Sequence, residues 1–175
     1  MYHNYRLWIA VLLFSLSTVT PLIAQKNKSL WTSIAASQLQ SDPLWSRKTE
    51  VSIASFYRVD LNLLKNQLAN APQRGLSSGL STTIIEYPTS NGIEFFRVKE
   101  ASVMATELQA TYSDFRSYVG QSVSDPTNQI RFSLTSQGFH GMMFSSKLGM
   151  QFVDSYTMDN SSVIVYKKDD LIDYG

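Results

Sequence analysis

Short stretches of alternating apolar and polar residues, separated by turn sequences, dominate roughly the last third of this chain. In the clearest stretch, Ile130, Phe132 and Leu134 alternate with polar side chains. A period of two places the apolar side chains on one face of a β-strand, so each stretch can bury one face. Because turn residues separate these stretches, the pattern predicts consecutive antiparallel strands. They are expected at 116–121, 130–135, 139–144, 150–153 and 163–167.

The segment before this region predicts a strand followed by a helix. Alternation over 51–58 indicates a strand buried on at least one face. Asp60 comes next, and its carboxylate can accept hydrogen bonds from the free N–H groups of a first helical turn. Leucines at helical spacing then predict a helix over 61–68, which Ala71-Pro72 ends.

A hairpin and a second helix are expected next. Asn91-Gly92 lies between the apolar runs 82–87 and 93–98, and both of its residues tolerate the positive φ of a tight turn. A short helix follows, with Ser102 as a possible cap. The predicted fold class is therefore α+β: a hairpin-rich antiparallel β-sheet domain with two short helices.

The N-terminus has the pattern of a secretory signal peptide. Arg6 makes it weakly basic, the apolar run 7–14 follows, and the small residue Ala24 precedes Gln25. Signal peptidase recognises this order, so residues 1–24 are predicted to be removed by cleavage near Ala24 and Gln25. A membrane anchor is the alternative, but a spanning helix needs about 20 apolar residues. We therefore expect an exported protein in the periplasm, on the cell surface or outside the cell, with no stable membrane anchor.

The remainder is expected to be one domain with a short lead-in. Residues 25–50 are polar and mixed, with Trp31 and Trp45 as apolar anchors that dock on the domain at 51–175. The full chain has 15 Lys and Arg and 14 Asp and Glu, so removal of Arg6 leaves 14 of each. A neutral domain with scattered charges does not favour nucleic acid as a partner. Without cysteine, its stability has to come from packing.

Few residues offer catalytic chemistry. After cleavage His140 is the sole histidine. It could serve as a general base or metal ligand, but a strand side chain that faces water or packs beside aromatics is the simpler interpretation. One histidine excludes a His-Glu-x-x-His zinc helix within this chain, and no serine lies in a nucleophile elbow. Asp169, Asp170 and Asp173 suit either a Ca²⁺ site or a solvated acidic tail. We therefore predict no catalytic, cofactor-binding or metal-ligating residue in this chain.

Lys167 and Lys168 form a possible processing site ahead of Asp169-Asp170. The alternative interpretation is a lysine pair that ends an edge strand, where lysines oppose strand pairing with other chains.

Several segments together resemble the pro-region of secreted bacterial reprolysin-like (adamalysin-type) zinc metallopeptidases. The most distinctive is Phe95-Phe96-Arg97-Val98-Lys99-Glu100-Ala101-Ser102-Val103-Met104. The other matching segments are 56–61, 71–75, 117–121, 130–135, 138–142 and 163–171. The resemblance covers most of the chain from Trp31 to Leu171, and it depends on the order and spacing of the segments rather than on one motif.

The resemblance implies a precursor with a signal peptide, a pro-domain and a zinc peptidase domain. The pro-domain would assist folding and keep the peptidase latent, and its partner would be the cognate peptidase domain, in cis or in trans. Zinc would belong to that peptidase domain, which we expect to lie outside this chain. Animal relatives can use a pro-region cysteine to ligate zinc, and this chain has none. Inhibition would then require covering the cleft, adding a β-strand to the peptidase, or a carboxylate.

Two other functions remain open at this point. One is a free-standing exported binding or adhesion domain, whose sheet presents aromatic side chains to a protein or glycan. The other is a small hydrolase that uses His140, which would need a serine or carboxylate brought beside it by the fold.

Overall fold

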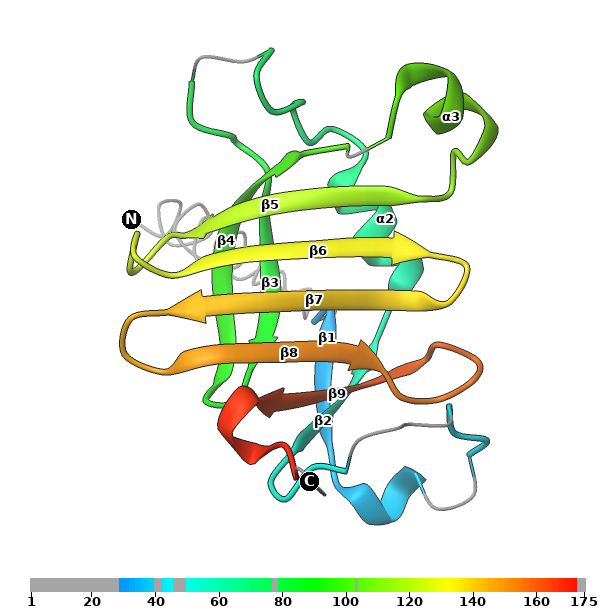
Figure 1. Cartoon of the computed structure of the whole chain (residues 1–175), viewed down its shortest axis with the longest axis vertical. Coiled ribbons are helices and arrows are strands. Elements are labelled where there is room, and N and C mark those ends of the chain that lie inside the picture. Colours follow the sequence, from blue (N-terminus) through cyan, green and yellow to red (C-terminus); the bar gives the residue numbers. More distant parts are fainter. Residues whose placement is uncertain (1–28, 40–41, 46–49, 77–78, 103, 173–175) are drawn as a thin grey trace, which may run out of the picture.

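The computed structural model describes residues 29–39, 42–45, 50–76, 79–102 and 104–172. Nine strands form a single antiparallel sheet in the order β1-β2-β9-β8-β7-β6-β5-β4-β3 (Figure 1). From β3 to β9, each strand therefore pairs with the next one along the chain. The strands are β1 (Trp31–Ile34), β2 (Ser55–Val59), β3 (Ile84–Thr89), β4 (Gly92–Glu100), β5 (Arg116–Ser122), β6 (Gln129–Thr135), β7 (Gly138–Ser145), β8 (Gly149–Ser155) and β9 (Ser162–Lys167).

The sheet is strongly curved and nearly closes on itself. In Figure 1, β5 to β9 run across the front, while β1 to β4 run behind them in a different direction. The two edge strands, β1 and β3, come into contact. Glu86 of β3 links them: its backbone oxygen accepts a hydrogen bond from Trp31 Nε1 at 2.9 Å, and its Oε2 accepts one from Leu30 N at 3.0 Å. Side chains thus join the edges where a backbone ladder would otherwise be needed.

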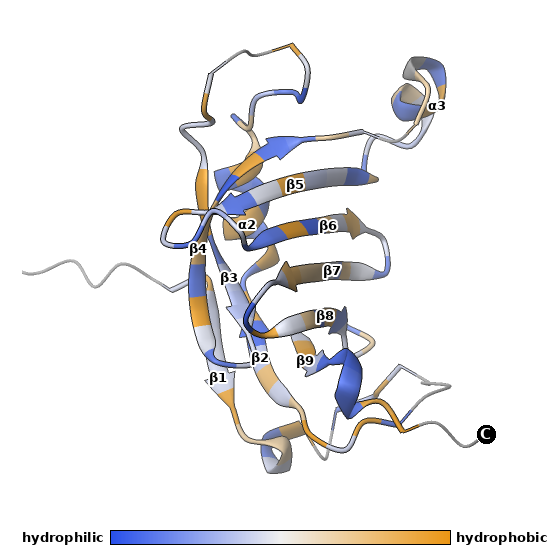
Figure 2. Cartoon of the chain, turned by 60° about the vertical axis from the view of Figure 1, so that its left-hand side comes forward, coloured by the Kyte–Doolittle hydropathy of each residue, from blue (hydrophilic) through white to orange (hydrophobic). Residues whose placement is uncertain are grey.

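The concave face of the sheet encloses the core. Hydropathy alternates along the strands in Figure 2, as expected where one face is buried. Large aromatic side chains meet at the centre: Phe139 stacks on Phe132 with ring centroids 5.2 Å apart, and Trp31 packs edge-on against Phe139 at 5.3 Å. Burial of one such side chain stabilises the fold by about 1.5–3 kcal/mol.

Helix α2 (Leu61–Leu68) covers part of this core with Leu64 and Leu68, which are buried. The Asp60 side chain accepts a hydrogen bond from Leu63 N at 3.0 Å, which confirms the predicted N-cap. The second helix, α3 (Thr106–Thr111), begins at Ala105 without a side-chain cap, so Ser102 is not its N-cap. Two short 3₁₀ turns, η1 (Ala36–Leu39) and η2 (Lys168–Asp170), complete the described elements.

The prediction of an antiparallel β-sheet with two short α-helices is confirmed in outline, although the sheet forms most of the described structure. The strand expected from residue 51 begins at Ser55, because Val51 makes an isolated bridge to Leu171 instead. Strand β1 lies within the 25–50 segment that the sequence suggested as a lead-in. Among the described residues, no helix has the length and apolar character needed to cross a membrane.

The two predicted tryptophan anchors differ in depth. Trp31 is buried in the core. Trp45 remains 36% exposed, and its backbone N–H bonds to Tyr156 O at 3.0 Å. Both side chains contact the domain, but only Trp31 contributes to the core cluster.

Candidate functional site

The convex face of the sheet presents side chains in rows that run across the strands. The strand registers align Lys99 of β4 with Val119 of β5, Val119 with Arg131 of β6, and Arg131 with Met142 of β7. A neighbouring row begins at Arg97 and runs through Gln121, Gln129, Phe144 and Met150. Directly paired side chains in such rows have Cβ atoms about 4.5–5.5 Å apart. Residues distant in the sequence therefore form one continuous surface.

A groove of about 400 Å³ lies over these two rows. We call it the outer-face groove, and it lies between the sheet and the segment that precedes β3. Its cationic side chains are Arg74, Arg97, Lys99 and Arg131. Its apolar lining includes Leu80, Val119, Met142, Phe144 and Met150, and the buried Ile130 and Met143 lie beneath them. No carboxylate is among the described residues that line it.

The segment before β3 positions two of the cations. Arg97 Nη1 donates a hydrogen bond to Ser81 O at 3.3 Å, and Lys99 Nζ donates one to Gly79 O at 2.7 Å. These backbone carbonyls orient the two cationic groups toward the segment before β3. Within the described parts of the chain, Arg74, Arg97 and Arg131 have no carboxylate at ion-pair distance. The groove is therefore a basic site on an almost neutral chain.

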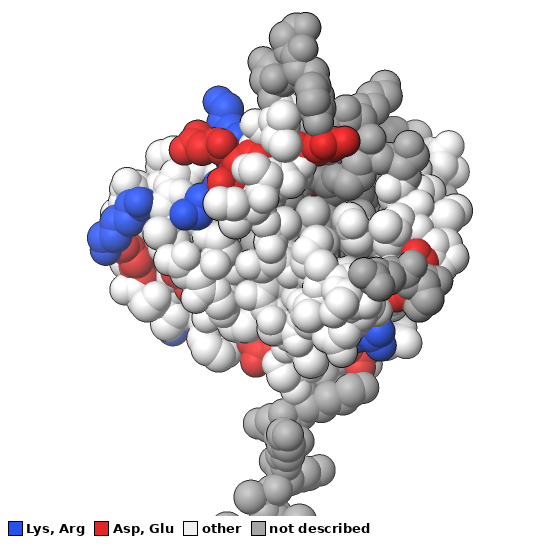
Figure 3. Space-filling view, turned by 90° about the horizontal axis from the view of Figure 1, so that it is seen from below, with Lys and Arg blue, Asp and Glu red and all other residues white. Residues whose placement is uncertain are grey.

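Apolar side chains occupy the part of the groove over β7 and β8. Phe144 is 57% exposed and Met142 is 37% exposed. Exposed aromatic and methionine side chains beside arginines are typical of surfaces that bind other proteins. The lower face of the molecule differs, because its Lys, Arg, Asp and Glu side chains lie scattered over a mostly uncharged surface (Figure 3).

A second polar cluster contains His140, the histidine that the sequence singled out. His140 Nδ1 lies 3.1 Å from Asp154 Oδ1, and Tyr166 OH donates a hydrogen bond to Asp154 Oδ2 at 2.7 Å. These three residues come from β7, β8 and β9. The hydrogen bond with Asp154 raises the pKa of His140 above its usual value, although partial burial opposes the rise.

The geometry of this cluster does not suit general-base catalysis. His140 Nε2 is buried and has no hydrogen-bond partner among the described residues. Ser133 is aligned with His140 across β6 and β7, but no hydrogen bond joins its hydroxyl to the ring among the contacts of the described residues. The nitrogen that would take a proton from a nucleophile is thus closed to substrate in this conformation.

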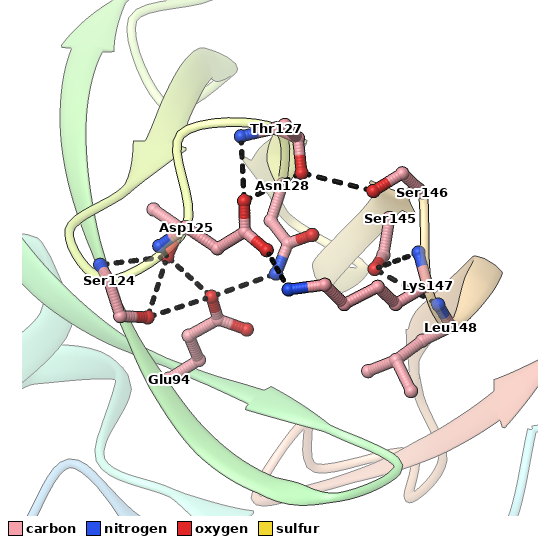
Figure 4. Close-up of polar contacts among 10 residues, drawn as sticks. Glu94, Ser124, Asp125, Thr127, Asn128, Ser145, Ser146, Lys147 and Leu148 are labelled. Carbon is pink, nitrogen blue, oxygen red and sulfur yellow. Dashed lines mark hydrogen bonds and ion pairs between the residues drawn. The ribbon is translucent and has the colours of Figure 1, made fainter.

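A third cluster ties the turn between β5 and β6 to the rest of the sheet (Figure 4). Glu94 Oε1 accepts hydrogen bonds from Ser122 Oγ and from Asn128 Nδ2, the latter at 3.0 Å. Lys147 Nζ contacts Asp125 Oδ2 at 2.8 Å, and this hydrogen bond together with those from Thr127 lowers the pKa of the Asp125 carboxyl to about 2. Most polar groups of this cluster are paired with one another, so it stabilises the turns, although the buried Asn128 Oδ1 has no hydrogen-bond partner among the described residues.

The remaining sequence candidates are dispersed. Asp169 and Asp170 lie in η2, and Asp173 is outside the described residues, as are Ala24 and Gln25. No group of three or more His, Cys, Asp or Glu side chains in the described part of the chain could hold a metal ion. Lys167 ends β9, whose neighbours are β2 and β8. The lysine pair therefore does not end an edge strand, because β9 is interior.

Sequence reasoning did not identify the outer-face groove. Arg97, Lys99, Arg131 and Phe144 all occupy the outward positions of alternating strands, so each by itself resembles an ordinary solvated side chain. The signal that could have found them is the register of the hairpins, because turn positions fix which outward residues become neighbours.

No protein-family model matches this chain, and neither does any curated protein or any solved structure.

Proposed function

We propose that this chain is the pro-domain of a secreted reprolysin-like zinc metallopeptidase precursor, which assists folding of the peptidase domain and keeps it latent by binding it. The resemblance of segments from Trp31 to Leu171 to such pro-regions supports this class. The observation that carries the proposal is the outer-face groove, where exposed Phe144 and Met142 lie beside Arg131. A pro-domain needs a surface of this kind, with apolar contact area and charge to fix orientation.

The groove is a better docking surface than the sheet edges. Strand addition requires a free row of backbone groups at an edge. The edge of β3 already receives a hydrogen bond from Trp31 Nε1 at Glu86 O, and Leu30 N bonds to the Glu86 side chain. A peptidase strand would have to displace these contacts first. We therefore propose that the domain covers the peptidase with its outer face, which needs no cysteine.

A free-standing exported binding or adhesion domain is the second candidate. One observation favours it: the β3–β4 hairpin carries a separate exposed apolar patch. Ile84 is 40% exposed, Phe95 is 52% exposed, and Ile93 and Val123 lie near them around a shallow hollow. Two apolar surfaces would suit a domain that joins two partners as well as one that covers a single enzyme.

The small hydrolase based on His140 has the least support. It would require Nε2 to face a nucleophile or an activated water, whereas that atom is buried. We retain His140 as a structural residue of the β7–β8–β9 region.

Export is part of the proposal. The full chain is expressed in a bacterial host with its own N-terminus, and the released protein is sequenced from its first residue. A new N-terminus at Gln25 would establish cleavage of residues 1–24, and retention of Met1 in the cell would contradict it. Fractionation of the periplasm, the cell surface and the medium then assigns the compartment.

The test of function uses the processed protein and a reprolysin-like zinc peptidase encoded in the same genome. Peptidase activity and recovery of refolded peptidase are measured with increasing amounts of the chain. The pro-domain proposal expects dose-dependent inhibition or improved refolding. The variant Phe144→Ser should weaken either effect, whereas Leu108→Ser removes another exposed apolar side chain, on α3, and should leave both effects unchanged. A folded chain with no effect on the peptidase would favour the free-standing binding domain.

A further inference from the structure

The outer-face groove has two chemically distinct halves. Over β4, β5 and β6 it presents the cations Arg97, Lys99 and Arg131. Over β7 and β8 it presents Met142, Phe144 and Met150. The order of the strands in the sheet fixes this arrangement, because β6 is the neighbour of both β5 and β7. A ligand that lies across the strands therefore meets positive charge first and apolar side chains next.

We infer that the groove binds an extended acidic segment of a partner protein, with a large apolar side chain following its carboxylates. This inference rests on the proposed function, since it names the chemistry of the peptidase surface that the pro-domain would cover. Charge complementarity carries the assignment: four cations and no carboxylate among the described residues line the groove. An extended segment fits because the groove runs over the face of the sheet rather than into a closed cavity.

The spacing of the strands sets the spacing of the ligand residues. Arg97 and Arg131 lie on strands separated by two interstrand intervals, about 10 Å, and in neighbouring rows offset by two residues, about 7 Å, so their backbones are about 12 Å apart. Three residues of an extended chain cover about the same distance. Two acidic residues three positions apart can therefore reach both guanidinium groups. The register aligns Met142 directly with Arg131, one strand further on, so a large apolar side chain two positions later would reach Met142 and Phe144.

The side chains of the groove suit this ligand. Arginine binds carboxylates in a bidentate manner, and Arg97 and Arg131 have no carboxylate partner among the described residues to compete with it. Methionine adapts its shape to an apolar partner because its side chain is unbranched and flexible. Met142, two residues before Phe144 on β7, and Met150, paired with Phe144 on β8, thus form an adaptable receiving surface for one apolar side chain.

The experiment uses the processed protein and a fluorescently labelled ten-residue peptide. The peptide has glutamates at its third and sixth positions, phenylalanine at its eighth and serines or glycines elsewhere. Fluorescence anisotropy is followed as protein is added, at low and at physiological ionic strength. We expect saturable binding that weakens as salt rises, since exposed charge pairs are screened. Two control peptides carry glutamines in place of the glutamates, or serine in place of the phenylalanine, and both should bind at least about tenfold more weakly.

Protein variants then place the peptide in the groove. Arg131→Gln and Arg97→Gln should each raise the dissociation constant about tenfold. Lys65→Gln removes an exposed cation from α2, away from the groove, and should change the dissociation constant by less than about twofold. Arg131 is exposed, so its variant is expected to fold, and thermal unfolding of each protein checks this. Equal binding of the glutamate and glutamine peptides, or no effect of the arginine variants, would overturn the inference.

A lipid surface is the competing occupant, and the same variants test it. If vesicles of phosphatidylglycerol and phosphatidylcholine bind more tightly than the peptide, and Arg131→Gln abolishes their binding, the groove is a membrane site and the peptide inference is wrong. The peptidase assay separates the two proposals. A chain that inhibits the peptidase but does not bind the acidic peptide retains the pro-domain function and loses this inference. A chain that binds the peptide through Arg131 without affecting the peptidase loses the pro-domain function and retains the peptide site.

Discussion

The hydroxyl oxygen of Tyr87 lies 2.5 Å from the position that a Cβ atom would occupy at Gly141. Tyr87 belongs to β3 and Gly141 to β7, so this contact crosses the interior of the curved sheet. The Tyr87 side chain is fully buried, and its hydroxyl has no hydrogen-bond partner among the described residues. Burial also raises the pKa of Tyr87 far above its usual value, so the hydroxyl stays neutral. Gly141 is thus required where the Tyr87 side chain approaches the backbone of β7.

The first prediction concerns this contact. Gly141→Ala should lower the free energy of unfolding by about 1–3 kcal/mol, because the added methyl group overpacks the core. Tyr87→Phe removes a hydroxyl without a partner and should be nearly neutral or slightly stabilising. In the Tyr87→Phe background the cost of Gly141→Ala should fall by about 1 kcal/mol, since the colliding atom is gone. Urea denaturation of the four proteins measures this coupling.

The matched control for the alanine substitution is Gly79→Ala. A Cβ at Gly79 meets no heavy atom of the described residues within 4 Å, and Gly79 is not among the glycines with positive φ. This variant should unfold at the same urea concentration as the wild type. A zero coupling between the substitutions at 87 and 141 would contradict the proposed close approach.

The second prediction contrasts Glu94 with the Lys147–Asp125 ion pair in the cluster of Figure 4. Glu94→Ala leaves Ser122 and the buried Asn128 amide without their shared acceptor, and should destabilise the protein by about 1–3 kcal/mol. Lys147→Ala breaks an ion pair with Asp125 in which the lysine side chain is 77% exposed. Such exposed pairs contribute little, so Lys147→Ala should destabilise the protein much less than Glu94→Ala. Thermal unfolding measures the stability of both variants. A similar loss of stability in the two would contradict the different roles assigned to Glu94 and Lys147.

The strands from β5 to β9 could be predicted from the sequence because turn residues separate them and because they show either alternation, as in β6, or an apolar run, as in β9. The helix 61–68 could also be predicted, since Asp60 as N-cap and the leucine spacing both indicate a helix that begins at residue 61. Strand β1 could not be predicted, because four residues give too little alternation and its partner strand β2 lies more than twenty positions further along the sequence. Leu108 and Tyr112 have helical spacing, yet about half of each is exposed because α3 packs few side chains against the sheet.

Less of the candidate site than of the fold could be predicted from the sequence. The chain is almost neutral and its charges are scattered along the sequence, whereas the fold brings four cationic side chains together in one groove. The charges come from β4, β6 and the segment before β3, so their meeting depends on strand register and curvature rather than on local sequence. His140 was correctly placed in a strand, but its partner Asp154 is fourteen positions away and could not be assigned, and neither could Tyr166, which donates to Asp154.

The third prediction tests the helix cap. Asp60→Ala removes the acceptor for Leu63 N and should lower the free energy of unfolding by about 1 kcal/mol. Asp60→Asn retains an oxygen acceptor and should recover most of this loss. Guanidinium denaturation of the three proteins measures the difference. If asparagine proves as destabilising as alanine, the stabilisation comes from the charge of Asp60 rather than from its capping hydrogen bond.

The fourth prediction concerns the pH dependence of His140. Its pKa is raised in the folded state by the hydrogen bond with Asp154, relative to an unfolded value of about 6.5. A raised folded pKa means that protonation favours the folded protein. The stabilisation is therefore complete below about pH 6.5 and is lost as the pH rises through the folded pKa. The ring is 39% exposed, so solvent weakens the interaction and the loss of stability should be modest.

In the processed chain His140 is expected to be the sole histidine, so its ring proton signals can be followed by NMR without ambiguity. The titration midpoint of the wild type should lie above about 6.5. Asp154→Asn should lower the midpoint, because the neutral amide no longer stabilises the protonated ring. Tyr166→Phe is the matched control: it removes another contact of Asp154 while leaving the carboxylate beside His140. A midpoint that is unchanged in Asp154→Asn would mean that the Asp154 carboxylate does not control the charge of His140. The pH dependence of unfolding would then have to come from other groups.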